Sequence, residues 1–275
     1  RLLNPDIPVI ARAEQKSVAA NMASFGTDHI INPYERFADS LALAVAAPER
    51  FRLIELLTSL PETPLAEPHQ PPHGHWILCG YGRFGHAVAE RLRNTGIRLT
   101  IIDPTASDAD RDIVGDGTEA STLHQAGIAE AQGIVAGGNN DINNLSVAVT
   151  ASELNPRLFV VARQNQAANN ALFATYGADF TVLPSRVIAQ ECIALLTAPL
   201  LARFLERVQQ LDERQCRQLV ERLQAACAGL TPVVWDNRLN AAEAPASWQA
   251  LMHGRTIELG SLLADAADRQ RRRRQ

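Results

Sequence analysis

Three glycines at fixed spacing give this chain its clearest chemical signal. A short apolar run, residues 77–79, ends at Gly80 and continues as Gly-x-Gly-x-x-Gly before a helical pattern. In such a sequence Gly80 allows a tight turn, Gly82 lets the backbone approach a pyrophosphate, and Gly85 lets helix pack on strand. Unpaired N–H groups and the helix dipole favour negative charge at the helix N-terminus. The spacing therefore predicts the phosphate-binding turn of a dinucleotide-binding half.

A carboxylate follows where a ribose would bind. A second apolar run, residues 98–102, ends at Asp103, which lies 21 residues after Gly82. Roughly 20 residues are expected between this turn and a ribose-binding acid. Such a carboxylate accepts hydrogen bonds from a ribose diol and repels a 2′-phosphate, which favours NAD(H) over NADP(H). The alternative is a turn that binds nothing, with Asp103 as a solvated strand end.

Composition excludes several classes of protein. The chain has 275 residues and a net charge of −4, which gives no sign of a general nucleic-acid binder. Lys16 is its only lysine, so it has neither the Gly-Lys-Ser/Thr of a P-loop nor a Tyr-x-x-x-Lys pair. No apolar run reaches the 18 residues of a membrane span. No metal is predicted, because the cluster of His69, His73 and His75 has no carboxylate or thiol to complete a ligand set.

The elements that must position the glycine turn alternate regularly from residue 75 onward. Short apolar runs separated by amphipathic stretches indicate a Rossmann-like, doubly wound parallel sheet with helices on both faces. The expected strands cover residues 76–79, 98–103, 112–114, 132–136, 157–162 and 179–182, and the expected helices cover 84–94, 119–126, 141–153, 166–176 and 185–197.

The chain also repeats itself at a constant offset of 151 positions. A shared fold class would give similar periodicity, but it would not give identical residues at one spacing. We therefore expect tandem lobes, of which residues 1–60 are the last part of a first lobe without its own glycine turn. By this interpretation the chain is a fragment of a longer tandem protein. The matched pairs are Asn4 and Asn155, Arg12 and Arg163, Gly26 and Gly177, Asp28 and Asp179, Pro33 and Pro184, and Pro48 and Pro199.

The remaining segments complete the expected organisation. Residues 61–74 are a Pro-rich linker, and residues 75–200 form the complete lobe. Residues 201–275 are predicted to hold an amphipathic helical stretch and part of a small C-terminal α+β module, with strands at 231–236 and 256–259. The basic run that ends the chain, residues 269–274, is interpreted as a solvated tail.

Four motifs in order resemble a known family. They are residues 79–85, the pair Ile102-Asp103, the Gly-Asp-Gly-Thr sequence at 115–118, and the Leu-His-Gln-Ala-Gly-Ile sequence at 123–128. Together they are similar to the RCK domain (regulator of potassium conductance), also called the Trk-type NAD-binding or TrkA-N domain. The resemblance covers about residues 75–200, with 1–60 similar to part of another copy. It implies control of a potassium channel or transport system by a bound nucleotide.

The resemblance also implies the binding residues. The turn would hold the phosphates, with the backbone N–H groups of Arg83 and Phe84 as donors. Asp103 would bind the adenosine ribose, and Asp116 with Thr118 would lie near the adenosine end. Arg163, at a strand end, would reach a phosphate or pair with a carboxylate. The implied set is Gly80, Tyr81, Gly82, Arg83, Phe84, Gly85, Asp103, Asp116, Gly117, Thr118 and Arg163.

Three functions compete at this point. The first is a nucleotide-sensing regulatory module that takes NAD(H), with ATP, ADP or AMP as alternatives, and acts on a membrane pore or transporter subunit encoded upstream in the same chain. The family implies a homo-oligomer, a dimer or a larger ring, in the cytoplasmic part of an inner-membrane protein. The second is an NAD-dependent oxidoreductase, but His86 and His124 near the turn have no evident catalytic partner. The third is an assembly module that binds no ligand. We expect no enzyme.

Overall fold

The computed structural model describes residues 7, 9–64, 70–105, 107, 111–197, 201–234, 239–242 and 244–257. Several predicted features lie outside these residues and are not discussed further. They are His69, the ends of the two C-terminal strands at 235–236 and 258–259, and the basic run at 269–274.

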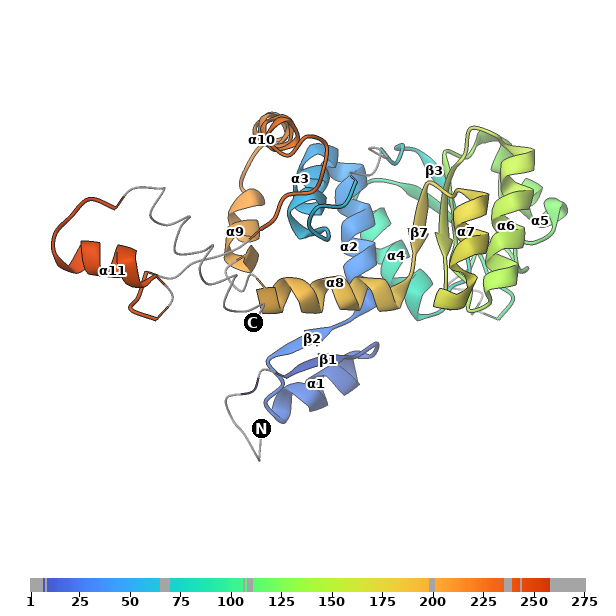
Figure 1. Ribbon diagram of the computed structural model, residues 1–275. Coiled ribbons are helices and arrows are strands. Elements are labelled where there is room, and N and C mark those ends of the chain that lie inside the picture. Colours follow the sequence, from blue (N-terminus) through green and yellow to red (C-terminus); the bar gives the residue numbers. More distant parts are fainter. Residues whose placement is uncertain are drawn as a thin grey trace.

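A five-stranded parallel sheet forms the centre of the larger lobe (Figure 1). Its order is β4-β3-β5-β6-β7, so the chain moves from β3 to one side and then returns to the other side of β3. This confirms the predicted Rossmann-like parallel sheet. The strands are β3 (His75–Cys79), β4 (Arg98–Ile102), β5 (Gly133–Ala136), β6 (Phe159–Arg163) and β7 (Phe180–Val182).

Helices cover both faces of this sheet because alternate strand residues point to opposite sides. Trp76 and Leu78 pack into a core with α2 (Pro33–Ala46) and α4 (Arg83–Arg93). Ile77 and Cys79 pack into a second core on the opposite face. The helical elements of that second face are α5 (Ala120–Gln125), the 3-10 turn η1 (Ile128–Glu130), α6 (Asp141–Leu154), the 3-10 turn η2 (Ala167–Asn169) and α7 (Asn170–Tyr176).

The predicted strand at 112–114 is reduced to one parallel bridge between Ile102 and Ile113. The carboxylate of Asp112 accepts the N–H of Ile101 at 2.7 Å. The side chain of Asp112 thus accepts the backbone N–H that a carbonyl of a neighbouring strand would accept if the ladder continued. For this reason the segment remains a turn against the edge of β4 and adds no sixth strand.

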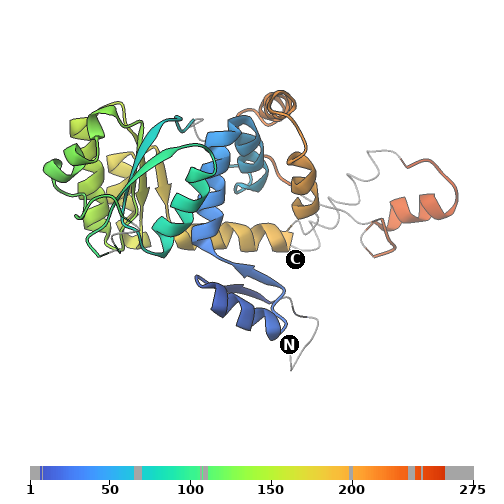
Figure 2. The ribbon, with the colours of Figure 1, turned by 180° about the vertical axis from the view of Figure 1, so that it is seen from behind.

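The offset of 151 positions recurs in space. Residues 10–46, here called the first unit, contain β1 (Ile10–Arg12), α1 (Lys16–Ser24), β2 (His29–Ile31) and α2. Residues 161–197, the second unit, contain the equivalent end of β6, then α7, β7 and α8 (Pro184–Thr197). Arg12 pairs with Ile31 in the first unit, and Arg163 pairs with Val182 in the second. In Figures 1 and 2 the β1–α1–β2 part lies beside the larger lobe, joined to it through α2.

The amphipathic stretch after residue 200 is two helices, α9 (Leu201–Val208) and α10 (Glu213–Ala226). They pack with α3 (Pro48–Thr58) around a small core that contains Leu53, Val208, Cys216 and Val220. Asp212 separates them because its carboxylate accepts the N–H of Gln215 and caps α10.

The predicted strand at 231–236 is absent from its described part, residues 231–234. Leu230 makes only an isolated antiparallel bridge with Pro64. Pro232 has no N–H with which to extend this pairing, which explains why the ladder ends. A helix, α11 (Pro245–Met252), follows instead. No helix in the described ranges is long and apolar enough to cross a membrane.

Candidate functional site

The sheet order places the glycine turn, residues 80–85, at a topological switch point. Gly80 follows β3, and Gly137 follows the neighbouring strand β5, while β4 lies on the other side of β3. The N–H of Gly137 donates to the carbonyl of Cys79 at 2.9 Å, so the two turns lie side by side. Open α/β sheets bind ligands at this kind of position, outside the carboxyl ends of the strands.

Each glycine of the turn has a distinct steric role. Gly80 has a φ of +95°, a backbone conformation that residues with a Cβ atom rarely adopt. A Cβ on Gly85 would lie 2.1 Å from the carbonyl oxygen of Gly80, so helix and strand touch there. A Cβ on Gly82 would meet no described atom within 4 Å. Gly82 is the N-cap of α4, and no described side chain caps this helix, so its first N–H groups face an open approach.

Asp103 connects the end of β4 to the glycine turn. Its side chain is 7% exposed, and its Oδ2 accepts the N–H of Tyr81 at 2.6 Å. Oδ1 accepts the N–H of Thr105 at 2.7 Å and its hydroxyl at 3.1 Å. These bonds fix the orientation of the carboxylate beside the glycine turn.

The Gly-Asp-Gly-Thr turn packs against the end of β3. A Cβ on Gly117, whose φ is +75°, would lie 2.6 Å from the sulfur of Cys79. Exposed Asp116 accepts the N–H and the hydroxyl of Thr118, and these bonds lower the pKa of Asp116 below its usual value. Burial raises the pKa of Cys79 to about 12, so this thiol is a packing group rather than a nucleophile.

The facing turn, residues 137–141, is held rigid by buried amides and a carboxylate. Asn144 accepts the N–H of Gly138 at 2.8 Å and donates to the carbonyl of Arg163 at 2.7 Å. Asp141 accepts four bonds from the segment after β6, two from Asn165, one from Gln166 and one from Asn169. Burial opposes ionisation of Asp141, but these hydrogen bonds keep its pKa below the usual value. The sequence analysis did not single out Asn144 or Asp141, although a run of Asn and Asp after a strand could have indicated such a turn.

Arg163 lies between this turn and α2, and its side chain is only 7% exposed. Its guanidinium donates to Asn139 at 3.0 Å and to the hydroxyl of Tyr34 at 3.1 Å. The same group lies over the ring of Tyr34 at 4.9 Å and of Phe84 at 5.3 Å. It makes no ion pair with a described carboxylate, so the carboxylate pairing considered above is not found. Burial lowers the pKa of Arg163.

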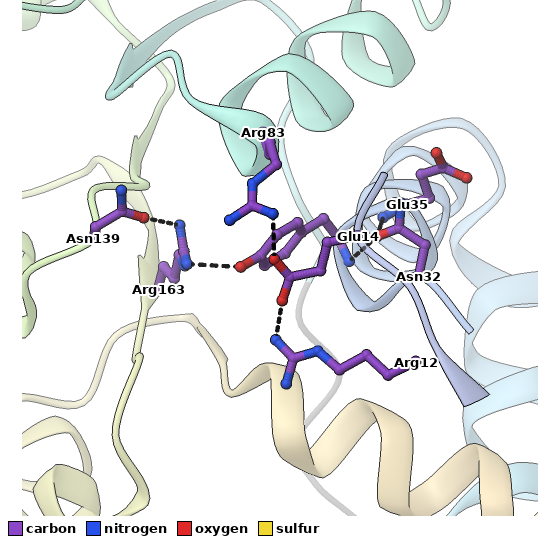
Figure 3. A network of polar contacts seen from close by, with 8 residues as sticks. Arg12, Glu14, Asn32, Glu35, Arg83, Asn139 and Arg163 are labelled. Atoms are coloured by element: carbon purple, nitrogen blue, oxygen red, sulfur yellow. Dashed lines mark hydrogen bonds and ion pairs between the residues drawn. The ribbon is translucent and has the colours of Figure 1, made fainter. Parts of the chain in front are cut away.

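Arg83 begins α4, and its guanidinium points toward Glu14 of the first unit, as Figure 3 shows. Its guanidinium pairs with Glu14 at 2.8 Å, and Glu14 also pairs with Arg12 (Figure 3). Glu14 and Tyr34 were missed by the sequence analysis. No local pattern could have indicated them, because their contacts with Arg83 and Phe84 depend on how the first unit packs against α4.

The structure thus brings most of the expected residues together. The glycine turn, Asp103 and Arg163 lie around the ends of β3, β4 and β6. Phe84 presents only its backbone to the turn, because its ring is buried against Phe37 at 5.7 Å. Asp116 and Thr118 bond to each other beside β3.

Comparisons with known proteins agree with this geometry. Residues 76–184 match the TrkA-N domain family. Potassium channel protein 1 of Methanocaldococcus jannaschii is 29% identical over 150 residues, which cover 51% of this chain and 45% of that protein. A crystal structure of GsuK bound to ADP is 26% identical with a TM-score of 0.52, covering 69% of this chain and 45% of that one.

A structure of the GsuK channel bound to NAD has a TM-score of 0.53 and covers 69% of this chain and 47% of that one. Its 19% identity shows likeness of fold alone. The chain spans less than half the length of each of these proteins. Residues 76–184 therefore form a TrkA-N domain, and the family resemblance found in the sequence is confirmed.

Proposed function

We propose that the lobe at residues 75–200 binds an adenine nucleotide as a regulatory signal for a potassium channel or potassium transport system. NAD(H) is the first choice of ligand, with ATP, ADP and AMP as alternatives. The observation that carries the proposal is the glycine turn at the switch point with Asp103 bonded to Tyr81 beside it. The likeness to GsuK bound to ADP supports the same ligand class.

The proposed site residues fall into three groups. The backbone of the glycine turn, from Gly80 to Gly85, holds the phosphates, and Asp103 accepts the ribose hydroxyls. Asp116, Gly117 and Thr118 lie toward the adenosine end, by analogy with the family. Arg163 supports the turn through Phe84 and Asn139 rather than through a carboxylate.

Coupling to a pore requires that the ligand bind one arrangement of the protein better than another. Helix α2 is suited to this role because it contacts the site directly. The ring of Tyr34 meets that of Phe84 at 5.9 Å, and its hydroxyl accepts from Arg163. Asn32, at the end of β2, caps the same helix. A movement of the glycine turn would therefore act on α2 and, through it, on the rest of the first unit, β1, α1 and β2.

The wider setting follows as part of the proposal. The partner is a membrane pore or transporter subunit, the assembly is a homo-oligomer, and the lobe works on the cytoplasmic side of an inner membrane. The proposed division is a first-lobe segment at 1–60, a linker at 61–74, the nucleotide lobe, and a C-terminal part at 201–275.

No catalytic role is proposed. His86 is exposed and its ring packs on Tyr81 at 3.9 Å, and a dehydrogenase would need a proton donor facing a substrate.

Calorimetry tests this proposal with NAD⁺, NADH, ATP, ADP and AMP titrated into the purified chain. We expect at least one to bind, and we expect Asp103→Ala to weaken binding by about tenfold or more through loss of a charge-assisted hydrogen bond. Asp39→Asn, on an exposed part of α2 away from the turn, is the matched control. Failure of all five ligands to bind would refute the nucleotide proposal, and NADH turnover would favour the oxidoreductase.

A further inference from the structure

Arg83 stands at a junction between the phosphate-binding turn and the first unit. It is the first residue of α4, where phosphates are expected, yet its guanidinium is paired with Glu14 at 2.8 Å. The side chain of Glu14 is 17% exposed and that of Arg83 is 57% exposed. The arginine therefore sits at the surface and can turn, whereas the carboxylate is held in place.

Glu14 is fixed from two sides. It lies two residues after the end of β1, and its carboxylate lies between Arg12 and Arg83 (Figure 3). A cavity of about 590 Å³ opens beside this pair, lined by residues of the first unit and of α4 that include Lys16, Tyr81 and Arg93. The space next to Arg83 is thus continuous with the glycine turn through Tyr81.

We propose that Glu14 is a positioning residue that competes with the ligand's phosphate for the guanidinium of Arg83. The inference rests on the nucleotide-binding function proposed above and names how the first unit acts on that site. Guanidinium groups bind carboxylates and phosphates through the same planar donors. When a phosphate recruits Arg83, Glu14 loses one of its two cationic partners and the contact between the first unit and α4 weakens.

The competition predicts an order among ligands. Adenosine has no phosphate and gains nothing from release of Arg83. AMP, ADP and NAD⁺ offer one or two phosphates near the first turn of α4, so removal of the Glu14 charge should help them. An ion pair that is partly exposed contributes little, so the expected gain is on the order of threefold to fivefold in affinity.

The test is a double-mutant cycle with Glu14→Gln and Arg83→Gln, read by calorimetry with adenosine, AMP, ADP and NAD⁺. Glu14→Gln keeps the shape of the side chain and removes its charge. We expect tighter binding of the phosphate-bearing ligands, unchanged binding of adenosine, and no gain from Glu14→Gln in the Arg83→Gln background. Glu35→Gln is the control, because Glu35 lines the same cavity without an ion pair among the described residues.

Hydrogen exchange gives a second readout that a merely structural role would not produce. Nucleotide should speed amide exchange in α1 and β1 of the wild-type chain, and Glu14→Gln should remove that response. Nucleotide affinity that is unchanged or weaker in Glu14→Gln would overturn this inference and leave the proposed function standing. A gain in affinity that persists in the Arg83→Gln background would do the same. If the wild-type chain binds none of NAD⁺, NADH, ATP, ADP and AMP, the proposed function fails and this inference fails with it.

Discussion

The first and second units have the same local structure in different surroundings. In both, an aspartate five residues before a helix accepts a backbone N–H near the start of the preceding strand: Asp28 accepts the N–H of Val9 at 2.8 Å, and Asp179 accepts that of Val160 at 2.7 Å. The helices α2 and α8 begin at Pro33 and Pro184 and both have 14 residues. Strand β6, however, lies between β5 and β7, whereas β1 pairs only with β2 among the described strands.

The difference shows what local sequence decides and what burial decides. Arg12 and Arg163 occupy equivalent positions at the end of their strands. Exposed Arg12 pairs with Glu14, while buried Arg163 bonds to Asn139 and Tyr34 beneath the phosphate turn. The same residue type is thus a surface ion-pair partner in one unit and a structural support in the other. Three matched pairs of substitutions and one pH dependence test this comparison.

The largest contrast is expected for Leu41 and Cys192, which are equivalent positions of α2 and α8. Leu41 is 0% exposed and packs in the core against the sheet, whereas Cys192 is half-buried. Leu41→Ala should lower the free energy of unfolding by about 3 kcal/mol through cavity formation. Cys192→Ala should cost less than about 1 kcal/mol. Urea denaturation of both variants measures the contrast, and equal losses would mean that the two helices are equally buried.

The next contrast concerns the two arginines. Arg163→Met should cost about 2 kcal/mol, because the carbonyl of Gly137 and the hydroxyl of Tyr34 lose their donor in a buried place. Arg12→Met should change the free energy of unfolding by no more than about 0.5 kcal/mol, since its side chain is 44% exposed. Thermal and urea unfolding compare them. A larger loss of unfolding free energy in Arg12→Met than in Arg163→Met would contradict the assignment of Arg163 as the structural support.

Replacement of the equivalent aspartates should give a smaller difference. Asp179→Ala removes the acceptor for Val160 within the central sheet and should cost about 1–2 kcal/mol. Asp28→Ala removes the same bond at an exposed place, where water can substitute, and should cost about 0.5 kcal/mol. Amide exchange at Val9 and Val160 reports each bond separately. Equal protection losses at the two amides with equal stability losses would argue against a role for burial.

The smallest effect is a pH dependence of the loop after β6, which lies in the second unit and is held by Asp141 of α6. Asp141 ties down the loop after β6, and hydrogen bonds keep its pKa below the unfolded value of 3.8 despite burial. Its stabilisation is therefore complete well above pH 3.8 and is lost as the pH falls through the lower, folded-state pKa. Asp141→Asn should cost about 1 kcal/mol at pH 6 and less at pH 3. A constant difference between these pH values would contradict the assignment.

Much of the fold followed from pattern and spacing. The strands that begin at 75, 98, 133 and 180 lie within a residue of their predicted starts, because short buried runs between turn residues indicate parallel strands. The pattern predicted a strand at 112–114, where only a single bridge forms. It could not show that the carboxylate of Asp112 accepts the N–H of Ile101 in place of a backbone carbonyl. The strand expected from residue 231 does not form in residues 231–234. Pro232 is a local signal against a strand, and the prediction gave more weight to the apolar residues around it.

The sequence by itself determined the glycine turn, the position of Asp103 after β4, the offset of 151 positions and the match of residues 76–184 to the TrkA-N domain family. These depend on backbone conformation and on spacing along one strand–turn–helix unit, which are local properties. Only the tertiary structure decided that Arg83 faces Glu14 and that Arg163 lies beneath the turn against Tyr34. Those contacts join residues 69 and 129 positions apart, and they depend on how α2 packs against α4, which no local pattern encodes.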